Sequence, residues 1–149
     1  MDCPDLEAAV GFIPYEEQDP HSQRLYRASD YASYEITPEH VRRSRQGYFA
    51  NISYIDDKIG ELFSILERTR MADDTIVVFA SDHGDMLGER GLWFKMCFYE
   101  GSARVPLMIA GKGIPAGRHD APTSNLDVYP TLCDLAGIDM AGIAPWTDG

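Results

Sequence analysis

A short apolar run that ends in a polar loop constrains the fold of this chain more than any other feature. Residues 75–80 (TIVVFA) are almost entirely apolar, and Asp82 and His83 follow closely. Such a run is typical of a parallel β-strand that is covered on both faces. In open α/β sheets, ligands bind beyond the carboxyl ends of the strands, so both residues are candidates for chemistry.

Asp82 and His83 have the side chains that a divalent cation uses as ligands. The carboxylate offers hard oxygen atoms, and the neutral imidazole offers a borderline nitrogen atom. Two ligands are too few for a closed metal site. In a second interpretation, Asp82 caps a turn and His83 forms local hydrogen bonds. The loop residues alone leave both interpretations open.

A long amphipathic helix is predicted before the apolar run. Thr37, Pro38 and Glu39 combine an N-cap hydroxyl, a proline for the first helical position and a first-turn acid. The apolar residues that follow recur at steps of three or four, as on one face of a helix. They are Tyr48, Ile52, Ile55, Ile59, Leu62 and Leu66. We predict a helix over about 38–69 and a strand over about 75–80.

A second strand and a shorter helix are predicted after the polar loop of residues 81–95. Residues 105–110 (VPLMIA) form another apolar run, and Ser124 with Asp127 resembles a capping box for a helix over about 125–136. Two parallel strands and two helices cannot close a doubly wound sheet, because its strands need neighbours. We therefore expect an α/β fold with a mostly parallel sheet, incomplete at both ends.

The remaining composition limits the partners of the chain. Residues 1–36 contain three prolines and no sustained periodicity, which indicates an irregular covering segment. A net charge of -11 disfavours nucleic acid as a partner. No apolar run approaches ~18 residues and no basic, apolar leader begins the chain, so we expect no membrane association and a cytoplasmic location. Cys3, Cys97 and Cys133 are expected to be free thiols.

The loop and its flanks resemble a known family. The run SDHGDMLGERGLWFKM, continued by FYEGSARVPLMIAGKG, is similar to the second metal-binding segment of the sulfatases in the alkaline-phosphatase-like superfamily. The similarity extends through YFANISYIDDKIGELFSILERT and SNLDVYPTLCDLAGI, and PYEEQDPHSQRL most resembles the choline-sulfatase group. This resemblance implies a segment of an α/β/α sandwich in which residues 37–149 form part of the catalytic domain.

The resemblance also implies roles for individual residues. Asp82 and His83 would be ligands of the catalytic divalent cation, which is Ca²⁺ in most sulfatases, with Mn²⁺ as an alternative. Lys95 would be a catalytic and substrate-binding residue, because its ammonium can donate to sulfate oxygens that gain charge in the transition state. Trp93 could wall a pocket for a quaternary ammonium group, although packing also explains it. The substrate would be a small sulfate ester, choline-O-sulfate, and the full-length protein a homo-oligomer.

One part of the family's machinery is absent from the sequence. Sulfatases of this family attack with a formylglycine made from the cysteine of a Cys-x-Pro-x-Arg signature, and none of the three cysteines begins one. We therefore expect the nucleophile to lie outside these residues and the 149-residue chain to be inactive alone. Two alternatives remain: a phosphonate or phosphate ester hydrolase of the same superfamily, and a non-catalytic truncated remnant.

Four charged residues around the loop are assigned supporting roles. Glu89 and Arg90 are expected to pair with each other at the surface. Glu100 and Arg104 are expected to pin the loop that carries Lys95, through a salt bridge or main-chain hydrogen bonds. His21, in contrast, is expected to be solvated or locally bonded.

Overall fold

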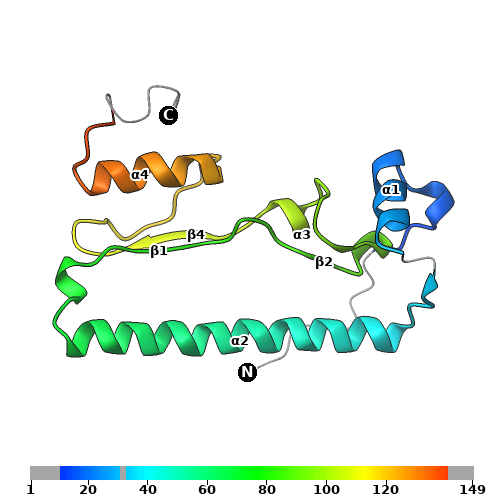
Figure 1. Ribbon diagram of the computed structural model, residues 1–149, viewed down its shortest axis with the longest axis horizontal. Coiled ribbons are helices and arrows are strands. Elements are labelled where there is room, and N and C mark those ends of the chain that lie inside the picture. Colours follow the sequence, from blue (N-terminus) through cyan, green and yellow to red (C-terminus); the bar gives the residue numbers. More distant parts are fainter. Residues whose placement is uncertain (1–10, 31–32, 141–149) are drawn as a thin grey trace. The chain divides into compact units, whose positions relative to one another are not determined.

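The computed structural model describes residues 11–30 and 33–140, which form two compact units divided between residues 114 and 115. The first contains the helices α1 (Pro20–Ala28), α2 (Pro38–Arg68) and α3 (Glu100–Ala103), and the strands β1 (Val77–Ala80), β2 (Met86–Leu87), β3 (Trp93–Phe94) and β4 (Leu107–Ala110) (Figure 1). The second contains the helix α4 (Val128–Leu135). The fold is a mixed α/β arrangement.

Helix α2 begins at the cap that the sequence indicates. The Thr37 hydroxyl accepts from the His40 main-chain N–H at 3.3 Å, and His40 Nδ1 accepts from the Thr37 N–H at 3.3 Å. Pro38 occupies the first helical position, where no main-chain N–H is needed. The helix then runs beside β1 and β2 and ends at Arg68 (Figure 1). This end lies within one residue of the predicted end near residue 69.

The strands of the first unit pair in the opposite sense to the sequence prediction. β1 and β4 are antiparallel, with Val77 opposite Ala110 and Ala80 opposite Leu107, so the prediction of a parallel pair is wrong for these two strands. A continuous apolar run favours a parallel strand only because it indicates that both faces of the strand can be covered, and an antiparallel strand covered on both faces can have the same run. β2 and β3 form a second antiparallel pair inside the region predicted as loop 81–95.

The N-terminal region contains a helix that the sequence prediction missed. Asp19 caps α1 by accepting from the main-chain N–H groups of His21 at 2.9 Å and Ser22 at 3.0 Å, and Pro20 follows it. This combination repeats the cap and proline of Thr37 and Pro38, so the signal was present in the sequence. An irregular segment over residues 1–36 is therefore wrong for Pro20–Ala28.

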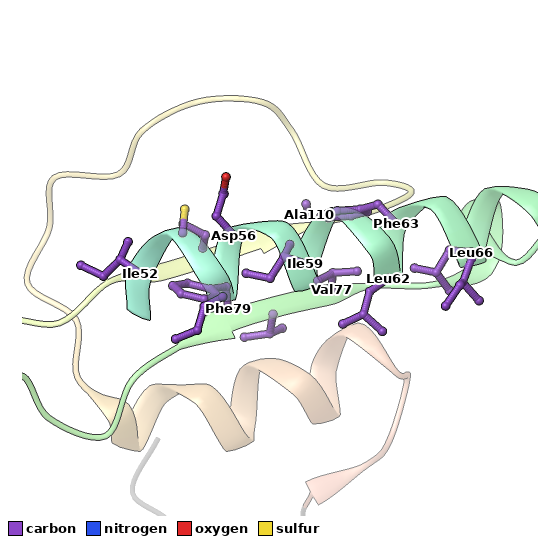
Figure 2. A pocket seen from close by; sticks show the side chains of 13 residues that line it. Ile52, Asp56, Ile59, Leu62, Phe63, Leu66, Val77, Phe79 and Ala110 are labelled. Carbon is purple, nitrogen blue, oxygen red and sulfur yellow. The ribbon is translucent and has the colours of Figure 1, made fainter. Parts of the chain in front are cut away.

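Apolar side chains of the first unit gather in two places. A small buried cluster lies under the β2–β3 hairpin, and it consists of Leu25, Met86, Leu92 and Cys97 with Tyr26 and Tyr99 packed against it. The second place is an open pocket of about 650 Å³ between α2 and the β1–β4 pair. Figure 2 shows Ile59 and Leu62 of α2 facing Val77 and Phe79 of β1 there.

The second unit is a short capped helix. Ser124 accepts from the Leu126 N–H at 3.1 Å, and Asp127 accepts from the Ser124 N–H at 2.6 Å. This cap begins a single 3₁₀ turn (Asn125–Asp127) that continues into α4, in the region predicted as a helix over about 125–136. Cys97 and Cys133 are both free and buried, whereas Cys3 lies outside the described residues. None of the helices described is both long and apolar enough to cross a membrane.

Candidate active site

The structure brings together the three residues that the sequence singles out for chemistry. Lys95 Nζ lies 2.7 Å from His83 Nε2, and Asp82 Oδ2 lies 3.4 Å from the same nitrogen atom. Asp82 and His83 follow the end of β1, while Lys95 follows the end of β3. The Asp82 side chain is 85% exposed and the His83 side chain is 32% exposed, so the group opens to solvent.

The hydrogen bonds of His83 determine which ring nitrogen can act as a ligand. His83 Nδ1 lies 3.0 Å from the main-chain oxygen of Gly84, and only a protonated Nδ1 can donate to that oxygen. The neutral ring then has its lone pair on Nε2, where it accepts from the Lys95 ammonium. The ring nitrogen that faces Asp82 and Lys95 is therefore the one able to bind a cation.

Gly84 fixes the loop by allowing a very close main-chain approach. Its N–H donates to the main-chain oxygen of Ser102 at 2.8 Å, and Ser102 is buried. A Cβ atom at residue 84 would lie 2.2 Å from the main-chain oxygen of Gly101, closer than any real contact. A glycine is needed here for space, and helix α3 thereby supports the loop that carries His83.

Lys95 lies between two residues with left-handed backbone conformations. Phe94 has a φ of 62° and Met96 has a φ of 72°, although neither is a glycine. Each such residue costs about 1–2 kcal/mol relative to an ordinary conformation. Conformational strain of this kind is found disproportionately at functional sites, because the surrounding structure must enforce it.

The indole of Trp93 packs within its own hairpin. A Cβ atom at Gly88 would lie 3.3 Å from Trp93 Cζ2 and 3.4 Å from Val41 Cγ1 of α2. The ring therefore lies against Gly88 and near α2, which is a packing environment. Its assignment as the wall of a substrate pocket stays a prediction.

The charged residues around the loop pair differently from the sequence prediction. Glu89 forms a salt bridge with Arg45 of α2 at 2.9 Å, and the Arg90 guanidinium lies 4.6 Å from the ring centre of Tyr99. The expected pair of Glu89 with Arg90 is therefore wrong. The partner of Glu89 lies 44 residues away in the chain, so this pair cannot be predicted from local spacing.

Three further residues differ in their surroundings from what the sequence suggested. Glu100 and Arg104 pair with each other at 3.3 Å, and both side chains are largely exposed, so within the part of the chain that the structure describes this pair does not pin the Lys95 loop. His21 of α1 instead lies next to that loop, because its Nε2 is 2.6 Å from the main-chain oxygen of Met96. This contact cannot be predicted from local spacing, because 75 residues separate His21 from Met96.

A complete metal site is not formed by the described residues. Residues 11–30 and 33–140 contain no group of three or more His, Cys, Asp and Glu side chains that could hold a metal ion. Asp82 and His83 supply one oxygen donor group and one nitrogen donor, which suit a divalent cation that takes its other ligands elsewhere.

Comparisons with known proteins identify related sequences and structures. The sulfatase family matches residues 14–138. The chain is 66% identical over 148 residues to a choline-sulfatase of Rhizobium meliloti (strain 1021), and the match covers 99% of this chain and 29% of that protein. It is 40% identical over 108 residues to arylsulfatase K of Danio rerio, covering 72% of this chain and 21% of that protein.

A solved structure supports the same relationship at the level of the fold. The phosphonate monoester hydrolase from Silicibacter pomeroyi superposes with a TM-score of 0.78 at 30% identity, covering 87% of this chain and 28% of the other. The chain thus spans less than a third of the length of each of these proteins.

Proposed function

Because the chain belongs to the sulfatase family, we propose that it contributes half of an active site that hydrolyses choline-O-sulfate to choline and sulfate. The observation that carries this proposal is the convergence of Asp82, His83 and Lys95 within hydrogen-bonding or ion-pairing distance. The identity of 66% to a choline-sulfatase supports the choice of substrate.

In the proposed site, Asp82 and His83 hold a divalent cation, with Ca²⁺ as the first choice and Mn²⁺ as the second. The donor set fits, because an exposed carboxylate lies 3.4 Å from His83 Nε2, the ring nitrogen that carries the lone pair when Nδ1 donates to the Gly84 oxygen. When bound, such a cation would screen the negative charges of the sulfate ester and of the nucleophile. Other ligands must come from residues outside the described set.

Lys95 has the role of a positive group that faces the sulfate. Its ammonium has three N–H donors. When a cation takes the single lone pair of His83 Nε2, the ammonium no longer donates to that nitrogen, and its donors are available to sulfate oxygens. Donors that are already oriented stabilise charge that develops on those oxygens in the transition state. The formylglycine nucleophile belongs to residues other than these 149, since the printed sequence has no Cys-x-Pro-x-Arg signature.

Other features of the complete protein are part of the same proposal. We propose a mostly parallel sheet in an alkaline-phosphatase-like α/β/α sandwich, to which the antiparallel pair of β1 and β4 contributes. We also propose a cytoplasmic homo-oligomer that acts on small sulfate esters.

A phosphonate or phosphate ester hydrolase is the second candidate, and the TM-score of 0.78 to a phosphonate monoester hydrolase favours it. Both ester classes present a tetrahedral anion to the same kind of cationic site. A direct comparison of kcat/KM for choline-O-sulfate and for a phenylphosphonate monoester decides between them. A non-catalytic remnant would hydrolyse neither.

The metal assignment is tested on protein expressed from the complete reading frame, called the full-frame protein below. Asp82→Asn keeps the size of the side chain and removes its charge, so we expect Ca²⁺ affinity and kcat/KM to fall together by about tenfold or more. Calorimetry measures the affinity, and sulfate release measures the activity. The control is Asp73→Asn, an exposed acid in the turn before β1, which should change neither. Equal Ca²⁺ affinity in Asp82→Asn and wild type would remove the ligand assignment.

A further inference from the structure

A buried salt bridge joins helix α2 to the hairpin that precedes Lys95. Arg45 Nη2 donates to Glu89 Oε1 at 2.9 Å, and the Arg45 side chain is only 6% exposed, against 30% for Glu89. Among the described residues of α2, Arg45 is the only one that is buried. A guanidinium stays charged when buried, so it requires a carboxylate and well-placed acceptors.

The same two side chains also bind both main-chain polar groups of Leu87 in β2. Arg45 Nε donates to the Leu87 oxygen at 3.0 Å, and the Leu87 N–H donates to Glu89 Oε2. The guanidinium fork and the two carboxylate oxygens thus form a closed ring of hydrogen bonds with one residue of the strand. Such a ring fixes the position of β2 relative to α2 more tightly than a single point contact would.

The position of β2 determines the position of Lys95. Leu87 lies opposite Trp93 and Met86 lies opposite Phe94 in the β2–β3 pair, and Lys95 is the next residue. The Gly88 N–H donates to the Leu92 oxygen at 2.9 Å, which closes the hairpin between them. The main chain at Lys95 is therefore linked through two residue pairs to Arg45, and its ammonium reaches His83 at 2.7 Å.

We propose that the Arg45–Glu89 pair is a positioning device for Lys95: it holds the hairpin so that the ammonium lies beside His83, where it can face the sulfate. This inference rests on the proposed function, because it assumes that Lys95 contacts the substrate. Neither Arg45 nor Glu89 touches the reacting atoms. Their effect on the reaction passes through Lys95.

Two substitutions in the full-frame protein loosen the pair without removing it. Glu89→Gln replaces one of the two carboxylate oxygens with an NH2 group, so a donor would stand opposite the N–H of either Arg45 or Leu87. Arg45→Lys keeps the charge but lacks the fork that reaches Leu87 and Glu89 together. The control is Glu61→Gln, which breaks the exposed pair of Glu61 with Lys58 on the same helix.

We expect Glu89→Gln and Arg45→Lys each to lower kcat by about tenfold or more while KM changes by less than about twofold, because displacement of a catalytic group by about 1 Å can cost a factor of 100 in rate. Glu61→Gln should leave both constants unchanged. If Glu89→Gln does not yield folded protein, the kcat of Arg45→Lys alone tests the inference.

A double-substitution cycle with Lys95→Ala separates positioning from general stability. If the pair acts through Lys95, then Glu89→Gln changes kcat by less than about twofold in the Lys95→Ala background. A loss of the same factor in both backgrounds would overturn the inference, because the pair would then act on something other than Lys95. If Lys95→Ala itself hydrolyses choline-O-sulfate as fast as wild type, the role of Lys95 in the proposed function fails instead. An unchanged kcat in both pair variants would overturn the inference and leave that role intact.

Discussion

Gly84→Ala is the substitution whose effect the structure defines most sharply. The new Cβ atom would lie 2.2 Å from the Gly101 oxygen and 3.3 Å from the Gly101 carbonyl carbon. To reach ordinary van der Waals contact, the two segments must separate by about 1 Å. Both atoms that obstruct the methyl group are main-chain atoms, so no side-chain rotation can relieve the overlap.

The separation has two measurable results. Overpacking of this kind costs about 1–3 kcal/mol in the free energy of unfolding. The displaced segment also includes the main-chain oxygen that holds the His83 ring, so a shift of about 1 Å should lower kcat/KM by about 100-fold. Urea unfolding measures the first quantity in the full-frame protein, and initial rates of sulfate release measure the second.

Gly60→Ala provides a matched control. Gly60 lies inside α2, and a Cβ atom there would meet nothing within 4 Å. Alanine is the better helix former, so the free energy of unfolding should rise by up to about 1 kcal/mol and the activity should stay unchanged. If Gly84→Ala instead matched wild type in stability and in kcat/KM, the close approach to α3 would have no role in supporting the site.

Two further predictions concern the caps of the helices. Thr37→Ala removes the side-chain acceptor at the start of α2, so the free energy of unfolding should fall by about 1 kcal/mol in urea, with a loss near zero contradicting this role. The hydrogen bond from the Ser22 hydroxyl is the largest of the causes that lower the pKa of Asp19, to about 2. Stability from this cap should be present above about pH 4 and be lost as the pH falls toward 2. Carbon NMR of the Asp19 carboxyl group should show a midpoint near 2, and a midpoint near 4 would contradict the cap.

The sequence predicted local features and missed long-range ones for an identifiable reason. The cap at Thr37 and the face of α2 depend on residues within one or two helical turns, and these can be read from spacing. The antiparallel sense of β1 and β4 depends on how residues 81–106 return the chain, which apolar runs do not encode. The cap at Asp19 is also local and has the same pattern as Thr37 and Pro38, but it lies among the prolines of residues 1–36, which favour an irregular segment.

The candidate site divides in the same way. Asp82, His83 and Lys95 can be predicted from the sequence because they lie within one stretch of 14 residues, 82–95, and their roles in metal and sulfate binding stay predictions. The Arg45–Glu89 pair could not be found from the sequence, because a helix and a hairpin must first be packed together before an arginine and a glutamate meet.

The left-handed residues on either side of Lys95 set stability against activity. Phe94 and Met96 each hold a conformation that glycine or asparagine would adopt at lower cost. Replacing either residue with glycine should therefore relieve strain, and the freer backbone would then let the lysine move away from His83. The strain lies on the segment that holds the ammonium, so stability and activity oppose each other along these three residues.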